Sequence, residues 1–300
     1  MTTRTPPWTI LGVPIDSIGA PAGGPPFGTE LAPQTLRALD VVDRLGAHDA
    51  GDLDVRITGP ARDAGTGLVG GSTVAPVVAE VRHATAALVA TGARPLLLGG
   101  CCALLMGAFA GAVDQRDGLG LAYVDGHLDI YDHHTSPTGE AADMPVGVLL
   151  GFGEPGLLAA SGPTPPLRAE RLRVLGARDR DELADVAPLA EWWGVINESP
   201  ESIAHDPLST AGRTLDSVAG NGFWLHVDLD VLDADVFPAT DYLMPGGLDL
   251  PALTALLRAL ADDPRLVGAS LACYNPVKDP DGRHGRQLVD LLVESFGPTS

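Results

Sequence analysis

The sequence predicts an α/β protein in which a mainly parallel sheet lies between two layers of helices, a three-layer α/β/α sandwich. Two observations support this class. Apolar runs of strand length alternate with helical segments along the chain, and two motifs with alternating acidic residues follow directly on such runs. Hydrophobic residues make up 45% of the 300 residues, enough for a sizeable core. No composition break or repeat divides the chain, so we expect a single domain over residues 1–300.

Strands are expected where short apolar runs stand between turn-forming residues. Most of these runs lack polar alternation, which indicates strands that are buried on both faces. The expected strands cover residues 9–15, 52–57, 95–100, 119–124, 172–176, 223–227 and 266–273.

Helices are expected where apolar residues recur at near-helical spacing between start and stop signals. In 31–45, Pro33 falls in the first turn, where proline is tolerated. A further helix is expected to begin after Gly99-Gly100-Cys101-Cys102, and residues 197–210 are ambiguous. The other expected helices cover residues 31–45, 72–89, 144–152, 182–192, 250–260 and 286–295, with loops at 16–28, 130–143 and 162–166.

Charge and cysteine content exclude several classes of partner. The formal net charge is −20, from 39 acidic and 19 basic residues, which argues against a nucleic-acid or anionic-membrane surface. The uncharged run 95–113 fits a buried strand, a turn and a buried helix better than a membrane span. Three cysteines make a poor disulfide framework, so we expect reduced thiols and a cytoplasmic protein.

Two acidic motifs stand at the ends of expected strands. Asp125, His127 and Asp129 alternate directly after 119–124, and Asp228 and Asp230 alternate at the end of 223–227. Residues two apart in a strand point the same way, so each set shares a face. So many buried carboxylates need compensation, and a pair of divalent cations provides it.

Structural explanations compete for the neighbouring residues. A carboxylate at a strand end can cap a turn, which explains one or two acids but not two alternating sets. His226 shares the face of Asp228 but lies further back in its apolar run, so we interpret it as a core or supporting histidine. We interpret Asp233 as a capping residue or a partner of a ligand rather than as a metal ligand itself. Cys102 is either a buried small hydrophobe or a metal ligand.

Taken together, these segments resemble the arginase/agmatinase (ureohydrolase) family. The family pattern is Gly-Gly-x-His, then Asp-Ala-His-x-Asp, then Asp-x-Asp-x-x-Asp. The three segments of this chain read Gly99-Gly100-Cys101-Cys102, Asp125-Gly126-His127-Leu128-Asp129 and Asp228-Leu229-Asp230-Val231-Leu232-Asp233. Further family marks are Gly28-Thr29-Glu30, Met144-Pro145, Pro245-Gly246-Gly247-Leu248 and Asn275-Pro276, so the likeness spans nearly the whole chain.

The resemblance implies an arginase-like fold and two metal ions, which in this family are manganese. By position, Asp125 and Asp228 would bridge the two ions. A water shared by the ions would be deprotonated near neutral pH and attack an sp² carbon that bears nitrogens. The remaining implied ligands pair as Cys102 with Asp129 on one ion, and His127 with Asp230 on the other.

Three residues depart from the family pattern. Cys102 replaces a histidine ligand, and a thiolate also suits zinc, iron, cobalt or nickel. Ala142 stands where arginases carry an acid/base histidine, and Cys273 stands where a glutamate pairs with the substrate guanidinium. The Cys102 exchange, together with Ala142, resembles the Nω-hydroxyarginine hydrolase of cycloserine biosynthesis, a relative of arginases.

We therefore expect a hydrolase of a C–N bond in a linear amidine, with a modified guanidino substrate such as Nω-hydroxyarginine. The alternatives are a formimino, ureido or amide substrate, or a catalytically impaired binding protein. The partner is a small molecule, and the choice between monomer and homo-oligomer stays open. The candidate residues are Asp129, Glu140 and His133 for catalysis, His134, Asp143 and Cys273 for the substrate, and Cys102, Asp125, His127, Asp129, Asp228 and Asp230 for metal.

Overall fold

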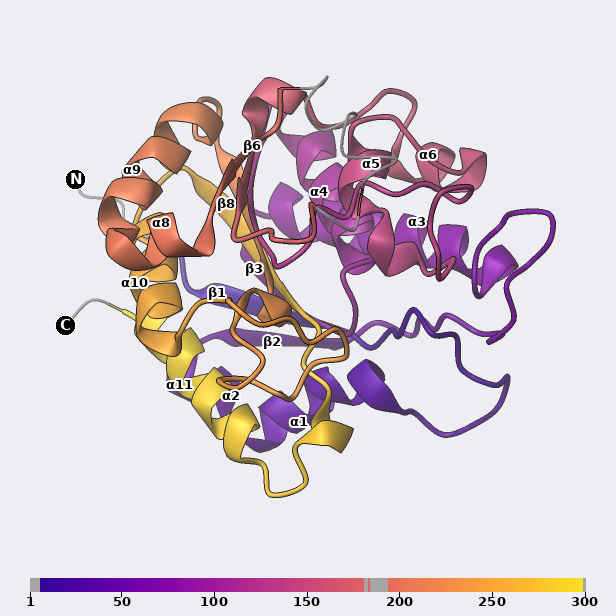
Figure 1. The fold of residues 1–300 in the computed structure, drawn as a ribbon, viewed down its shortest axis with the longest axis horizontal. Coiled ribbons are helices and arrows are strands. Elements are labelled where there is room, and N and C mark those ends of the chain that lie inside the picture. Colours follow the sequence, from indigo (N-terminus) through magenta and orange to yellow (C-terminus); the bar gives the residue numbers. More distant parts are fainter. Residues whose placement is uncertain (1–5, 181–182, 184–193, 299–300) are drawn as a thin grey trace.

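The fold is built on one parallel sheet (Figure 1). The computed structural model describes residues 6–180, 183 and 194–298. In this part of the chain, eight strands lie in the order β2-β1-β3-β8-β7-β4-β5-β6, and all neighbours are parallel. The strands are β1 (Trp8–Val13), β2 (His48–Asp52), β3 (Arg94–Gly99), β4 (Gly120–Val124), β5 (Leu172–Leu175), β6 (Ile196–Glu198), β7 (Phe223–Asp228) and β8 (Leu266–Ala272).

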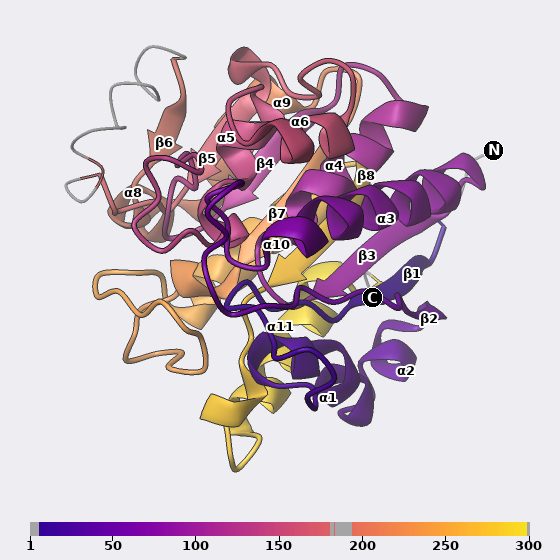
Figure 2. The same ribbon diagram turned by 90° about the vertical axis from the view of Figure 1, so that its right-hand side faces the viewer.

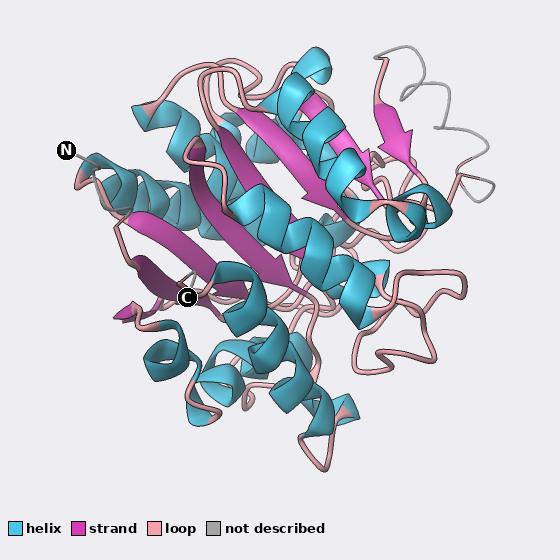
Figure 3. Cartoon of the chain, turned by 90° about the vertical axis from the view of Figure 1, so that its left-hand side faces the viewer, coloured by secondary structure: helices cyan, strands magenta, loops and turns pink. Residues whose placement is uncertain are grey.

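Helices cover both faces of the sheet, as Figures 2 and 3 show from opposite sides. One face carries α3 (Gly71–Ala90), α4 (Leu104–Gln115), α5 (Pro145–Leu149) and α6 (Pro155–Ser161). The other face carries α1 (Ala32–Ala38), α2 (Val41–Leu45), α8 (Pro200–His205), α9 (Pro207–Val218), α10 (Leu250–Ala261) and α11 (Arg283–Phe296). Short 3-10 helices are η1 (Gly28–Leu31), η2 (Ala141–Asp143), η3 (Ala169–Arg171), η4 (Leu229–Val231) and η5 (Pro276–Lys278).

The side chains of each central strand alternate between two cores. In β4, Leu121 and Tyr123 pack in the core under α3 and α4, whereas Ala122 and Val124 pack in the core under α9 and α10. All four side chains are buried. This two-sided burial explains why the strands read as continuous apolar runs, and it confirms the predicted three-layer α/β/α class.

The expected second strand was placed too late in the chain. The structure has β2 at His48–Asp52, a mostly exposed edge strand with the sequence His-Asp-Ala-Gly-Asp. It needs no apolar run because it joins the sheet through backbone pairing with β1. The apolar residues after it leave the sheet, and Ile57 is instead buried in the core under α3.

The other differences concern helices. The expected helix 31–45 is broken into α1 and α2 because Asp40 adopts a left-handed conformation, with φ of 62°. The ambiguous region contains β6, α8 and the start of α9, and α6 was not predicted. Most of the expected helix 182–192 lies outside the described residues. The uncharged run 95–113 divides into β3, a turn and α4, and no helix of the described chain is long and apolar enough to span a membrane.

Two glycines allow α4 to approach α3 closely. A Cβ on Gly107 would lie 2.5 Å from the carbonyl oxygen of Val78, and a Cβ on Gly111 would lie 2.3 Å from that of Arg82. Both neighbours are backbone atoms of α3, which cannot move without moving the helix. The spacing between the two helices therefore depends on the absence of a side chain at these positions.

We predict opposite effects for the same substitution in two helices. Gly111→Ala should lower the free energy of unfolding by about 1–3 kcal/mol because the added methyl overpacks the α3–α4 contact. Gly212→Ala, in α9, meets no atom within 4 Å and should raise it by about 0.5–1 kcal/mol. Urea unfolding followed by circular dichroism measures both. Equal changes for the two variants would contradict the packing role of Gly111.

Candidate metal centre and active site

The candidate site lies where four neighbouring central strands end. In the order β3, β8, β7 and β4, these strands lead to Cys102, Cys273, Asp228 and Asp125. The carboxyl ends of parallel strands are where open α/β sheets carry their sites. Side chains from these ends line a cavity of about 160 Å³. Its lining consists of Asp16, Ser17, Ile18, Thr29, Cys101, Cys102, Asp125, His127, Asp129, Tyr131, Pro137, Thr138, Glu140, Ala142, Asp143, Asp179, Asp228, Asp230, Asp241, Tyr242 and Cys273.

Asp125, His127 and Asp230 form one compact donor group. The Nδ1 atom of His127 lies 2.9 Å from Asp230 Oδ2 and 3.7 Å from Asp125 Oδ1. The backbone N–H groups of Gly126 and His127 donate to Asp230 and Asp125, at 3.0 and 2.7 Å. Both carboxylates are thus held by main-chain donors as well as by the imidazole, which fixes them toward a shared point.

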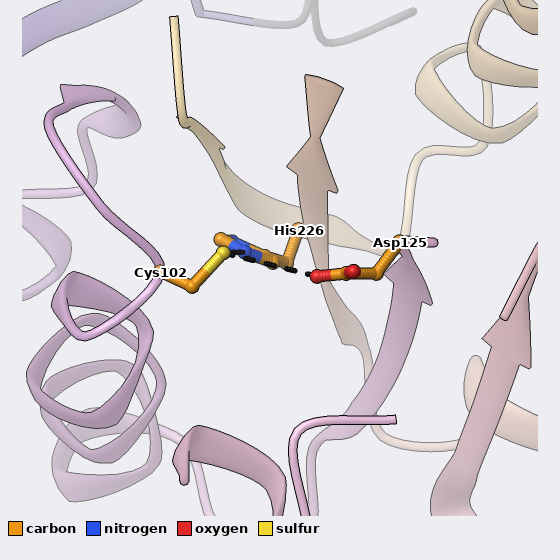
Figure 4. A group of neighbouring side chains, drawn as sticks. All are labelled: Cys102, Asp125 and His226. Carbon is orange, nitrogen blue, oxygen red and sulfur yellow. Dashed lines mark hydrogen bonds between the residues drawn. The ribbon is translucent and has the colours of Figure 1, made fainter. Parts of the chain in front are cut away.

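A second donor group surrounds Cys102. Its Sγ atom lies 3.8 Å from Asp125 Oδ2 and 3.7 Å from Cys273 Sγ, and it also contacts Asp228 Oδ2. His226, from β7, brings its Nε2 atom to 3.5 Å from the same sulfur. Figure 4 shows Cys102, His226 and Asp125 converging from three separate segments. Potential ligand atoms of these three residues lie within 4.8 Å of one another, and so do those of Cys102, Asp228 and Cys273.

Burial shapes the protonation of the cluster. It raises the pKa of Asp228 to about 7, with repulsion from Asp230 adding to the effect. Burial and nearby aspartates also raise the pKa values of Asp125 and Asp129 well above the ordinary range. Desolvation raises the pKa of Asp230, but the charge of His127 and the hydrogen bonds from His127 and the Gly126 N–H together lower it below its ordinary value. Without a further positive charge, the buried cluster therefore retains protons that isolated aspartates would have lost.

Most of the residues expected to bind metal come together. Cys102, Asp125, His127, Asp228 and Asp230 all belong to one or other of these two donor groups. Asp129 is buried in the cavity wall, but its carboxylate accepts a hydrogen bond of 2.5 Å from Tyr123 and belongs to none of these groups. Carboxylates, imidazole and thiolate in two adjoining groups fit a pair of divalent cations.

The loop 130–143 contributes two acids to the cavity but neither histidine. Glu140 accepts hydrogen bonds from Ser17 Oγ at 2.6 Å and Tyr242 Oη at 2.7 Å. Asp143 accepts from two hydroxyl groups of its own loop. His133 and His134 are not part of the cavity lining, and His134 is exposed. The backbone of this segment turns around Asp132, whose carboxylate accepts the N–H groups of His134 and Thr135.

Several lining residues were not singled out from the sequence. Asp16 and Ser17 follow β1, and Asp241 and Tyr242 stand in the loop before α10, so no acidic alternation marks them. Asp179 accepts the N–H of Leu128 at 3.1 Å, whereas its other oxygen is buried without a hydrogen-bond partner. No sequence pattern identifies these residues. They reach the cavity because each lies in a loop that follows a strand of the same sheet.

Fold and site together define an α/β protein with a buried, carboxylate-rich donor cluster at the carboxyl ends of its central strands. Residues 7–297 match the family described as the arginase family. The chain belongs to this family, which confirms the family, the fold and the enzyme class predicted from the sequence. Ureohydrolases of this kind are hydrolases that act on C–N bonds in linear amidines.

Known relatives agree over their whole length. An arginase from Brevibacillus brevis is 28% identical over 96% of this chain and 97% of its own. The solved arginase of Bacillus caldovelox superposes with a TM-score of 0.86 at 24% identity, covering 98% of this chain and 99% of that one. Formimidoylglutamase from Bacillus subtilis has a TM-score of 0.75 at 18% identity, covering 100% and 90%, which shows a shared fold.

We predict that the stability of the metal-free protein falls as the pH rises from about 4 to about 7. Asp228 has a raised pKa of about 7 in the folded protein, against about 3.9 in an unfolded chain. In this window the folded state binds more protons than the unfolded state. The free energy of unfolding therefore falls by about 1.4 kcal/mol per pH unit for one such group. A divalent cation should offset this cost.

Thermal unfolding in EDTA and in Mn²⁺, at about pH 5 and about pH 7.5, measures the effect. The melting temperature in EDTA should be lower at the higher pH, and Mn²⁺ should raise it more there than at the lower pH. Asp228→Asn, which removes this titrating carboxylate, should reduce the pH dependence in EDTA. A metal-free protein that gains stability across this window would contradict the interpretation.

Proposed function

We propose that this protein hydrolyses a C–N bond in a modified guanidino compound of the Nω-hydroxyarginine class, with two divalent cations in the cluster. The observation that carries the proposal is the joint presence of a carboxylate-rich donor cluster and of Ala142 and Cys273 in the same cavity lining. When bound, the cations would act as Lewis acids and lower the pKa of a water to generate the nucleophile near neutral pH.

The charge of the cavity favours a cationic substrate. Nine carboxyl side chains line it, and neither lysine nor arginine occurs among its described lining residues. Two divalent cations would balance Asp125, Asp129, Asp228 and Asp230. The other five carboxyl side chains are Asp16, Glu140, Asp143, Asp179 and Asp241, and of these Asp241 pairs with Lys278 at 2.8 Å. A guanidino head or an ammonium group on the substrate would compensate part of the remainder.

The two exchanged residues favour a modified head group over a plain one. Cys273 offers a thiol, which cannot make the charge-assisted pair that a carboxylate makes with a guanidinium. An N-hydroxyguanidine is less basic than a guanidine, so its binding depends less on such a pair. The acid absent at Ala142 must then be supplied by another residue of the cavity. We propose manganese for the ion held by Asp125, His127 and Asp230, because carboxylate and imidazole ligands suit manganese.

Glu140 is our candidate for proton transfer in place of the missing histidine. It lies two residues before Ala142, lines the cavity and is 9% exposed. Burial raises its pKa, so the carboxyl retains a proton further toward neutral pH than an exposed glutamate. Ser17 and Tyr242 hold its two oxygens in place. Such a group can protonate the departing nitrogen while water adds to the carbon.

The cellular setting completes the proposal. Cys101, Cys102 and Cys273 are all free thiols in the structure. A site that uses thiols requires a reducing compartment, so we propose that the protein works in the cytoplasm on a small-molecule substrate.

Turnover assays test the substrate class. The metal-loaded protein should convert Nω-hydroxyarginine and water to ornithine and hydroxyurea. This reaction should be at least about tenfold faster than the release of urea from arginine or agmatine, because the Cys273 thiol forms no charge-assisted pair with a plain guanidinium.

Asp125→Asn should reduce the rate of hydroxyurea release about 100-fold or more by weakening metal binding. Rapid release of urea from arginine would overturn the inference from Cys273. Turnover of a formimino compound alone would favour that alternative, and failure to bind metal would favour a binding protein.

Substitution of Glu140 tests its assigned role. Glu140→Gln retains the size and polarity of the side chain but cannot donate a proton as a carboxylic acid, so kcat and kcat/KM should fall together by about 10²–10⁴-fold. Asp143→Asn, in the same loop, serves as the matched control and should change kcat much less. A rise in KM with unchanged kcat for Glu140→Gln would instead assign Glu140 to substrate binding.

A further inference from the structure

A buried histidine outside the predicted ligand set faces the cluster. His226 lies in the middle of β7 and is fully buried, on the same face as Trp224 and Asp228. Its Nε2 atom is 3.5 Å from Cys102 Sγ, and an Asp125 oxygen completes the group (Figure 4). A side chain that only fills the core has no need to present its polar edge to two potential ligands.

The ring of His226 is held in one orientation by Ser270 and Tyr123, and Trp224 in turn positions Ser270. Its Nδ1 atom lies 2.8 Å from Ser270 Oγ, and the indole N–H of Trp224 donates to the same oxygen at 3.0 Å. Tyr123 stacks on the ring with a centroid distance of 5.3 Å and an interplanar angle of 11°. In the tautomer that metal binding at Nε2 requires, Nδ1–H donates to Ser270 and the lone pair of Nε2 is directed at the cluster. Metal-binding histidines commonly anchor their second nitrogen in this way.

The distance between Cys102 Sγ and His226 Nε2 matches that between two donors that share one ion. On a tetrahedral Zn²⁺, with Zn–S of about 2.3 Å and Zn–N of about 2.0 Å, a sulfur and a nitrogen lie about 3.5 Å apart and two sulfurs about 3.8 Å apart. The observed separations are 3.5 Å from Cys102 Sγ to His226 Nε2 and 3.7 Å from Cys102 Sγ to Cys273 Sγ. The Asp125 oxygen lies 3.8 Å from Cys102 Sγ, slightly longer than the distance of about 3.5 Å expected for sulfur and oxygen on one such ion.

We propose that His226 is a metal ligand that binds, through Nε2, the same ion as Cys102 and Asp125. This half of the centre then has sulfur, imidazole and carboxylate donors and selects a zinc-like cation. The half formed by Asp125, His127 and Asp230 has no sulfur donor and accepts manganese. The inference rests on the proposed function only for the presence of metal, and its test does not require turnover.

Cobalt spectroscopy tests the ligand directly. One equivalent of Co²⁺ added to the metal-free protein should give a thiolate-to-cobalt charge-transfer band together with visible ligand-field bands. His226→Gln should retain the charge-transfer band, shift the ligand-field bands and weaken Co²⁺ binding by more than about 100-fold. Ser270→Ala removes only the anchoring partner and should weaken binding by about 10–100-fold. His83→Ala, on the exposed surface of α3, should match the wild type in both spectrum and affinity.

A second measurement decides the matter even if the His226 variant does not fold. In His127→Ala, His226 is the one imidazole left among the described donor groups. X-ray absorption with one equivalent of Zn²⁺ should then show sulfur at about 2.3 Å and imidazole nitrogen at about 2.0 Å. Sulfur without imidazole, or unchanged ligand-field bands and affinity in His226→Gln, would overturn the proposal and leave His226 as a hydrogen-bond partner of the thiol. If His226 proves not to bind metal but the protein still releases hydroxyurea, the proposed function stands without this inference. If the spectra are as expected but no substrate is turned over, the inference stands and the proposed function is overturned.

Discussion

Burial of aspartates at the ends of β4 and β7 is the constraint on which the site depends. The two strands pair in parallel register from Gly120 opposite Phe223 to Val124 opposite Val227, so the next residues are Asp125 and Asp228. Neither carboxylate can retreat to water, since both are almost fully buried. A slip of one residue in this pairing would turn one set of acids to the opposite face. The register of two apolar strands therefore decides whether the acids can act together.

The segment after β5 holds the two ligand loops in place. The guanidinium of Arg178 donates to the carbonyl oxygens of Asp230, Leu232 and Met244, at 2.7, 3.2 and 3.1 Å. Its own backbone N–H donates to the carbonyl of Gly126, and the next residue, Asp179, binds the N–H of Leu128. One dipeptide thus joins the turn after β4 to the turn after β7. Because these contacts are made with main-chain atoms, they fix the backbone and leave the ligand side chains free to face the cavity.

Much of this arrangement could be predicted from the sequence, because alternation within a strand is a local property. Asp125, His127, Asp228 and Asp230 were recognised from their spacing alone, and the buried strands from their apolar runs. Strand order is not local. Cys102 and His226 are far apart in the chain, and they meet only because β8 alone separates β3 from β7 in the sheet. For the same reason the sequence indicates a core or supporting role for His226 and does not mark Asp16, Asp241 or Tyr242. The exposed β2 escaped notice because an edge strand is defined by its partner rather than by its composition.

Both ends of the described chain lie at the amino-terminal edge of the sheet, away from the cavity. Trp8, the first residue of β1, donates its indole N–H to the carbonyl of Phe296 at 2.9 Å, and the two rings meet edge to face. Arg94 covers the other side of the indole, with its guanidinium carbon 3.9 Å from the ring centroid. The first strand, β1, and the last helix, α11, are therefore joined directly through Trp8 and Phe296. A purification tag or a surface anchor attached near either end projects from the side opposite the cavity and leaves the path of a small molecule into it unobstructed.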